Sequence, residues 1–182
     1  TVLASAPLEA SDDWQWWNQL VFRHEMTDTV DLTVATEQKF SDDFSDFYLY
    51  NVTVVPTVDL AKGVSVGAGY RREIQECDDG DWTVENRLLV PLTLGWTVAP
   101  WTVRLRNQLE YRDLETTDRW RLRERITLAH PIRLGETAVE PFVSGEAFYD
   151  FTDERVNQSR FSVGVSVPWT KHISLALFYM HR

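Results

Sequence analysis

Four arginines occupy every second position of one short segment, at Arg119, Arg121, Arg123 and Arg125, with mostly hydrophobic residues between them. A β-strand places successive side chains on opposite faces, so this spacing predicts a strand with one guanidinium face and one hydrophobic face. The preceding segment, 101–112, repeats the alternation. An arginine that faces lipid at the middle of a bilayer costs roughly 2–4 kcal/mol, so both arginine faces must meet water or other charged groups. The chemistry that these residues favour is ion pairing.

Charged residues on the same faces of neighbouring segments are predicted to form one network inside the molecule. Three further residues, Asp31, Lys39 and Asp150, share these faces and bring the predicted set to eleven cations and eight carboxylates. Because these charges nearly cancel, we predict an interior largely plugged by ion pairs, or a narrow ionic pore where the pairing is incomplete. The predicted network residues are Glu37, Arg71, Glu73, Glu85, Arg87, Arg104, Arg106, Glu110, Arg112, Arg119, Arg121, Arg123, Arg125, Glu140, Glu146 and Arg160.

The sequence offers one arrangement that could support catalysis. His172 and Ser174 lie two residues apart, share a face of a predicted strand, and match the His-x-Ser pairing of some outer-membrane lipid hydrolases. No acidic or amide residue follows them at a plausible distance to orient the histidine, so we expect no enzyme activity and keep the lipid hydrolase as an alternative. The remaining histidines are dispersed without metal-ligand spacing, and we expect no metal and no cofactor.

The pattern of alternation predicts an all-β chain of about ten antiparallel strands in an up-and-down meander. Hydrophobic residues make up 43% of the 182 residues, but no run approaches the length of a spanning helix. The net charge of −10 argues against a nucleic-acid partner. Small residues on the charged faces, such as Gly67, Gly69 and Gly164, are expected to leave room for the arginines. The predicted strands are 14–25, 30–40, 46–58, 64–74, 83–94, 101–112, 119–130, 138–151, 158–167 and 173–181.

We expect one β-barrel domain over 14–182 after a flexible N-terminal segment, 1–13. Ala4-Ser5-Ala6 has the small-x-small form of a signal-peptidase site, so 1–6 is expected to be a remnant of an export signal. Aromatic residues favour the strand ends, where membrane barrels carry girdles. A soluble, lipocalin-like barrel for a small hydrophobic ligand stays open as an alternative. The predicted interface aromatics are Trp82, Trp96, Trp101, Tyr111, Trp120, Tyr149, Trp169 and Tyr179.

Several short motifs resemble, in order and spacing, a bacterial outer-membrane β-barrel family known as domain-of-unknown-function family 2490. They are Leu32-x-Val34-x-x-Glu37, Gly67-Ala68-Gly69-Tyr70-Arg71, Glu85-x-Arg87, the two arginine rows, Glu146-x-Phe148, Arg160-Phe161-x-x-Gly164 and His172-x-Ser174-Leu175-x-Leu177-x-Tyr179.

The resemblance implies a transmembrane β-barrel in the outer membrane of a Gram-negative bacterium. Its expected partners are membrane lipid, lipopolysaccharide and the outer-membrane assembly machinery, and no activity is implied. Such barrels usually end in a strand with a terminal aromatic residue, whereas this sequence ends in Met180-His181-Arg182. We therefore expect a longer parent chain that has up to twelve strands.

Overall fold

The computed structural model describes residues 16–41, 46–77, 80–114, 117–135, 137–168 and 173–181. These residues form one antiparallel sheet, and no helix among them is long and apolar enough to cross a membrane. The strands are β1 (Trp16–Thr27), β2 (Val30–Ser41), β3 (Asp46–Ala61), β4 (Val64–Gly67), β5 (Gly69–Glu76), β6 (Trp82–Val98), β7 (Trp101–Asp113), β8 (Asp118–Ala129), β9 (Ile132–Leu134), β10 (Thr137–Asp150), β11 (Arg155–Pro168) and β12 (Ile173–His181).

The predicted all-β meander is confirmed, although its strands number twelve rather than ten. One extra strand arises because the predicted strand 64–74 is interrupted, and the other, β9, lies between the predicted strands 119–130 and 138–151. Ala68 separates β4 from β5, which both pair with β3 and β6. His130 and Pro131 separate β8 from the short β9, which pairs with the beginning of β10. Proline lacks the N–H that a continuous ladder needs, which accounts for the break between β8 and β9.

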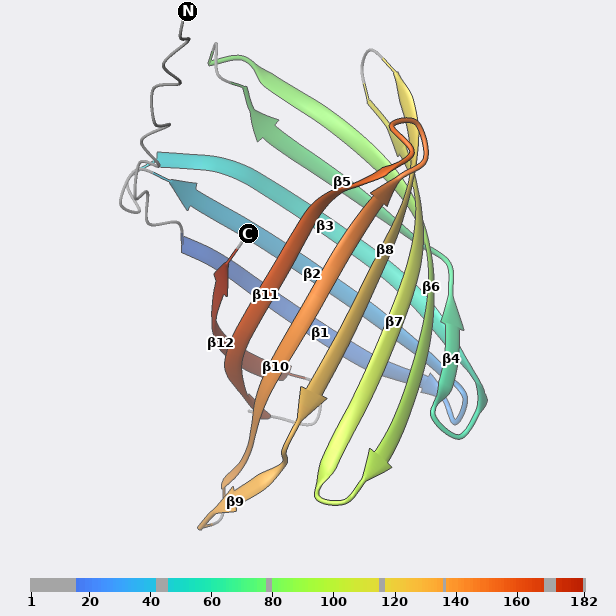
Figure 1. Ribbon diagram of the computed structural model, residues 1–182, viewed down its shortest axis with the longest axis vertical. Helices are drawn as coiled ribbons and strands as arrows, with labels where there is room; N and C mark the ends of the chain where they lie inside the picture. Colours follow the sequence, from blue (N-terminus) through green and yellow to red (C-terminus); the bar gives the residue numbers. More distant parts are fainter. Residues whose placement is uncertain are drawn as a thin grey trace, which may run out of the picture.

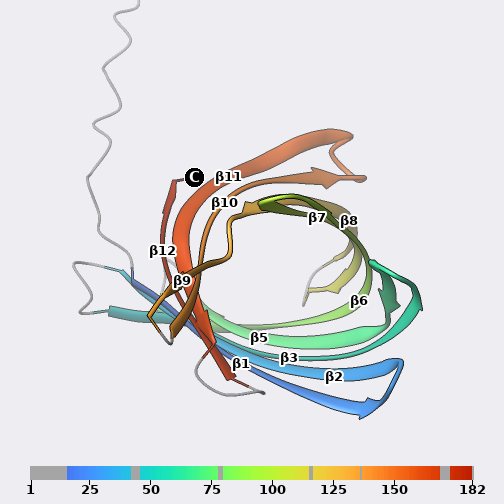
Figure 2. The same ribbon diagram turned by 90° about the horizontal axis from the view of Figure 1, so that it is seen from below.

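The sheet curls until its two ends meet (Figures 1 and 2). Strands that follow each other in the sequence pair with each other, except for β4 with β5 and β8 with β9, and β12 closes the circuit by pairing with β1. This closure is uneven: two pairs of residues join β1 to β12, at Val21–Ser174 and Phe22–Ile173, whereas eleven pairs join β1 to β2. The curl leaves one face of the sheet inside the molecule and the other outside.

The two faces differ in chemistry as the alternation predicts. On β6, Leu88 and Val90 point outward and are 56% and 49% exposed, whereas Arg87 points inward and is buried. On β7, Glu110 points inward and is fully buried. The sequence of β3 does not show which of its faces points inward. In the structure, the buried residues of this strand are Leu49, Asn51, Thr53 and Val55. The face that carries the arginines is therefore the inner one.

Gly67, Gly69 and Gly164 lie where neighbouring strands approach each other closely. A Cβ atom at Gly164 would lie 2.5 Å from the Leu177 carbonyl oxygen and 2.5 Å from the Phe178 Cβ atom, both on β12. At Gly67 and Gly69 the nearest atoms belong to Pro56, Thr57, Val54 and Val55 on β3 and to Pro91 on β6. The nearest neighbours of these glycines are therefore strand backbone and short side chains, so close approach of the strands is one reason for a glycine at each position.

Gly164→Ala is expected to lower the free energy of unfolding by roughly 1–3 kcal/mol, because the added methyl group must push β11 away from β12. Denaturant titration measures this change. Gly145→Ala is the matched control, since the atom nearest to its new Cβ is the Ile126 Cγ2 atom at 3.9 Å. Equal effects of the two substitutions would contradict the prediction.

Candidate functional site

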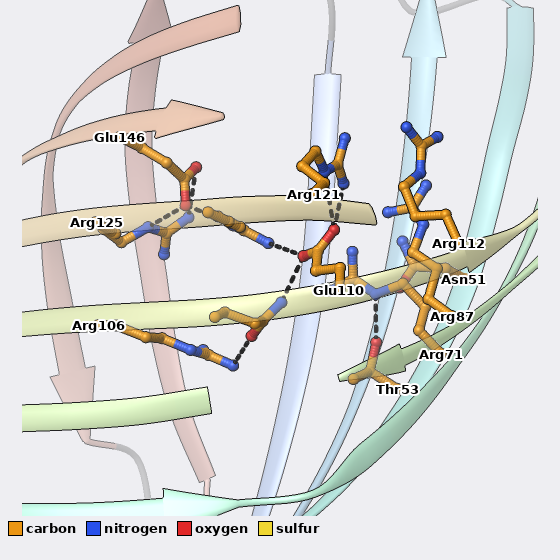
Figure 3. A network of polar contacts seen from close by, with 12 residues as sticks. Asn51, Thr53, Arg71, Arg87, Arg106, Glu110, Arg112, Arg121, Arg125 and Glu146 are labelled. Atoms are coloured by element: carbon orange, nitrogen blue, oxygen red, sulfur yellow. Dashed lines mark hydrogen bonds and ion pairs between the residues drawn. The ribbon is translucent and has the colours of Figure 1, made fainter. Parts of the chain in front are cut away.

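The inner face gathers charged side chains from β2, β5, β6, β7, β8, β10 and β11 into one network of polar contacts (Figure 3). Two carboxylates, Glu110 and Glu146, occupy its centre, and guanidinium groups surround both. Buried charges are stable only when they are paired and hydrogen-bonded, so the partners of each carboxylate decide what the network can do.

Glu110 on β7 accepts hydrogen bonds from a side chain of its own strand and from a side chain of β8. Arg121, directly opposite on β8, donates through Nη2 at 2.5 Å and through Nε at 2.9 Å. Gln108 donates to the other carboxylate oxygen at 2.5 Å and accepts in turn from Arg106 at 2.5 Å. The Arg123 guanidinium lies 4.0 Å from the same oxygen. The carboxylate is therefore satisfied on both of its oxygens.

The carboxylate of Glu146 on β10 lies within ion-pair distance of three arginines. Its cross-strand partners are Arg125 on β8 and Arg160 on β11. Arg125 donates to both carboxylate oxygens, at 2.9 and 3.2 Å, and Arg123 donates through Nε to one of them. The Arg160 guanidinium lies 3.9 Å away. One negative charge thus faces three positive charges.

The aromatic ring of Phe148 is buried two residues from Glu146 and lies beside three guanidinium groups of the network. The guanidinium carbons of Arg121, Arg123 and Arg160 lie 5.0, 5.3 and 4.6 Å from the centre of this ring. The negative face of an aromatic ring attracts cations, with about 2 kcal/mol or more for a desolvated pair. Phe148 therefore holds part of the positive charge that Glu146 does not neutralise.

A second group of ion pairs lies on β5, β6 and β7. Arg87 contacts Glu73 at 2.5 Å and Glu85 at 2.6 Å, and Arg112 contacts Glu85 at 2.5 Å. In the register of these strands Glu73 faces Glu85 and Arg87 faces Arg112. Like charges directly opposite each other are unfavourable, so the side chains form their ion pairs along the diagonals and along the strand instead.

Three further network residues lie near this second group. Glu37 on β2 contacts Lys39 at 3.1 Å and accepts a hydrogen bond from Asn51 at 3.5 Å. Arg71 on β5 donates through Nε to Thr53 Oγ1 at 2.8 Å. The hydrogen-bond acceptors of the Arg71 and Arg106 guanidinium groups are thus neutral oxygens.

Asp150 is the last residue of β10 and lies where the chain turns. It accepts hydrogen bonds from the backbone N–H groups of Thr152 and Asp153 at 2.9 and 3.3 Å, and Arg119 lies 3.7 Å away. Burial alone raises the pKa of Asp150, but these two N–H groups and the Arg119 guanidinium outweigh burial and hold the pKa below its ordinary value. The carboxylate is therefore charged at neutral pH and fixes Arg119 at the strand end.

The structure brings together fourteen of the sixteen predicted network residues through ion pairs or hydrogen bonds. The other two share the inner face but stand apart: Arg104 is exposed, and neither Arg104 nor Glu140 forms an ion pair with a described residue. The prediction omitted Asn51, Thr53, Gln108 and Phe148, which the structure places between the charges. For Gln108 and Phe148, the position on alternate residues of β7 and β10 was the signal that could have found them, whereas Asn51 and Thr53 lie on β3, whose sequence does not show which face points inward.

The predicted interface aromatics lie at both ends of the outer face. Trp82, Trp96, Trp101 and Trp120 are 43–49% exposed. Ring centres are 5.1 Å apart for Tyr111 and Trp120 at one end and 4.8 Å apart for Trp101 and His130 at the other. Tyr179 is exposed on β12, and Tyr149 packs on Phe151. Trp169 lies outside the described residues.

The residues of the hydrolase alternative are not placed by the structure. His172 lies outside the described residues, and Ser174 is described only by its backbone pairing with Val21 and Pro168. Among the residues that the structure does describe, no group of three or more His, Cys, Asp or Glu side chains could hold a metal ion.

The fold and the site define a class: an all-β, up-and-down antiparallel sheet, curled around an ion-paired inner face. The chain belongs to the family described as "Protein of unknown function (DUF2490)", whose model matches residues 14–182. This match confirms the resemblance noted in the sequence. A search of curated proteins finds none that matches the chain.

Proposed function

We propose that this protein is an integral β-barrel of the outer membrane of Gram-negative bacteria, with a charged and largely plugged interior and a structural or small-pore role without catalysis. One observation carries the proposal: large apolar side chains cover the outside of the curled sheet while the charged ones are buried within it. Water-soluble proteins rarely expose a continuous apolar surface of this kind, whereas lipid requires one.

The spacing of the outer aromatics supports a membrane location. Ten residue steps separate Trp101 from Tyr111 on β7, which is about 34 Å of strand at about 3.4 Å per residue. A strand tilt of about 40° reduces this to about 26 Å, close to the apolar band of about 25 Å on membrane barrels. Between them Val103, Leu105 and Leu109 present an apolar outer surface that Asn107 interrupts. Membrane lipid and lipopolysaccharide are the partners that suit this surface.

The interior argues against the soluble carrier of a small hydrophobic ligand. Such a carrier needs an apolar interior, but the inward residues of β7 and β8 include Glu110, Arg121 and Arg123, which pair with one another and with Glu146. Paired charges fill the space that a solute would cross, so we infer little or no conductance.

Partition and conductance test the proposal together. We expect the chain to enter the detergent-rich phase, to show a heat-modifiable gel shift, and to conduct little or no current in planar bilayers. A monodisperse monomer in aqueous solution without detergent would contradict the membrane location. A large open pore in the unmodified protein would contradict the plugged interior.

Conductance is expected to rise in the double variant Glu110→Ala/Arg121→Ala. This variant removes both members of a buried ion pair, so that neither charge is left without its partner. The matched control is Asp153→Ala/Arg155→Ala, which removes two charges at an exposed turn, where Asp153 lies 4.0 Å from Arg155 and 3.6 Å from Arg119. Single-channel recording measures the change, and equal conductance in both double variants would contradict plugging by this pair.

A further inference from the structure

A depression of about 680 Å³ lies on the outer face of the sheet, where β7, β8, β10 and β11 run side by side (Figure 1). Two small residues of β10, Gly145 and Ala147, form its floor, and the larger side chains of Ile126 and Phe161 on the neighbouring strands form its walls. A Cβ atom added at Gly145 would have no neighbour closer than the Ile126 Cγ2 atom, at 3.9 Å. The floor of the depression is therefore open to an incoming group.

One exposed carboxylate borders this depression. Glu124 lies on the outer face of β8, directly opposite Asn107 on β7 and Ala147 on β10 in the strand register. Ser159 on β11, directly opposite Ala147, adds a hydroxyl group to the same border. Among the residues that the structure describes, neither Glu124 nor Asn107 has a hydrogen-bond or ion-pair partner. The carboxylate thus has no counter-charge within the described part of the chain.

The depth of Glu124 makes the lack of a partner unfavourable. Four residue steps separate Glu124 from Trp120, which is about 14 Å of strand at about 3.4 Å per residue. A strand tilt of about 40° reduces this to about 10 Å, which is well inside an apolar band of about 25 Å. This inference rests on the proposed function, because only a membrane places lipid around the carboxylate. Ionisable groups at such a depth are unfavourable unless they are paired, and they commonly mark a binding site.

We propose that the depression binds a small apolar molecule that carries one protonated amine. The ammonium group donates hydrogen bonds to the Glu124 carboxylate and to the Ser159 hydroxyl, and a bond to an ionised acceptor is short and strong. The apolar body of the molecule fills the open space over Gly145 and Ala147. The exposed ring of Phe161 adds an aromatic face, which attracts cations.

The size of the depression favours a small molecule over a segment of a partner protein. Sites for small molecules span about 300–1,000 Å³ and combine an apolar lining with a few polar groups. The depression has a volume of about 680 Å³, and Glu124 and Ser159 place polar groups at its border. A lysine of a partner protein carries the same ammonium group, so a peptide probe is needed to separate the two sources.

Isothermal titration with adamantylamine tests the site, using the full chain folded in a non-ionic detergent. This probe combines a rigid hydrocarbon cage with one ammonium group, and adamantanol, which has the same cage and a neutral hydroxyl group, is the matched ligand. We expect saturable binding of the amine, about tenfold or more tighter than that of the alcohol, as a charge-assisted bond requires. Equal affinity for the two ligands, or no saturable binding of the amine, would overturn the proposal.

Two variants locate the bound amine. Glu124→Gln is expected to weaken binding about tenfold or more, because it removes the charged acceptor. Gly145→Leu is expected to abolish binding, because its side chain fills the open space above the floor. Retained binding in either variant would place the amine elsewhere and overturn the proposal. The heat-modifiable gel shift reports whether each variant folds, and the comparison of amine with alcohol needs no variant.

Glu25→Gln is the matched control, because it removes a carboxylate from an exposed position on β1, away from the depression. Retained binding in this control supports a specific site, whereas a loss equal to that of Glu124→Gln would show that net charge alone attracts the amine and would overturn the proposal.

A short apolar peptide with one central lysine is the third probe. Binding of this peptide without binding of adamantylamine would overturn the assignment to a small molecule. A heat-modifiable band and detergent partition that persist while the amine fails to bind refute this site alone and leave the proposed function standing.

Discussion

Glu146→Gln is expected to lower the free energy of unfolding by roughly 3–5 kcal/mol, which is the range for breaking a buried ion pair. The side chain is only 6% exposed, and its carboxylate is the partner of three arginines. Glutamine keeps the shape but removes the charge, which leaves these guanidinium groups to repel one another. Denaturant titration in detergent, followed by the heat-modifiable gel shift, measures the loss.

Glu140→Gln is the matched control for this change. Glu140 lies on the same strand and the same face as Glu146, but it is partly exposed and forms no ion pair with a described residue. We expect its substitution to change the free energy of unfolding by about 0.5 kcal/mol or less. If Glu146→Gln is as mild as this control, the inner charges are solvated rather than mutually dependent.

A double-mutant cycle with Arg125 separates the pair from its surroundings. Because Arg125 donates to both oxygens of Glu146, Glu146→Gln/Arg125→Gln is expected to be less destabilised than the sum of its two single variants. Additive losses would mean that Arg123 and Arg160 alone determine the cost of removing the carboxylate.

The sidedness of the sheet could be predicted from the sequence because a strand has a period of two. The arginines from Arg119 to Arg125 occupy strictly alternate positions, so the inward orientation of one of them implies the inward orientation of all four. The same reasoning could not resolve β3, where Leu49 and Val55 share the inner face with Asn51 and Thr53. A buried strand of mixed polarity carries no alternation, and only its neighbours decide its orientation.

The pairing within the network could not be predicted from the sequence. Alternation states that Glu73, Glu85 and Arg87 share a face, but it does not give the register that sets Glu73 opposite Glu85. Nor does the count of eleven cations and eight carboxylates show which arginines lack a carboxylate partner. In the structure Arg71 and Arg106 donate to the neutral oxygens of Thr53 and Gln108, and the register sets Arg71 opposite Arg87 and Arg106 opposite Arg125.

Val90→Arg is expected to lower the free energy of unfolding by roughly 2–4 kcal/mol if the outer face meets lipid, because an arginine at the middle of a bilayer costs that amount. Val90 is 49% exposed on the outer face of β6, six residues before Trp96 and eight after Trp82. In water the same substitution at an exposed position would change stability by about 0.5 kcal/mol or less. Denaturant unfolding from lipid vesicles therefore separates the two environments by several-fold.

Val98→Arg is the matched control, because it introduces the same arginine side chain at a different depth. Val98 is on the same strand and face and is 61% exposed, but it lies beyond Trp96, next to the turn at 99–100. Near the membrane interface an arginine costs only about 0–1 kcal/mol. A large loss at Val90 with a small one at Val98 is a dependence on depth, which only a membrane produces. Two small losses would mean that the apolar outer face meets water, and the proposed location would then be wrong even if the inner network behaves as expected.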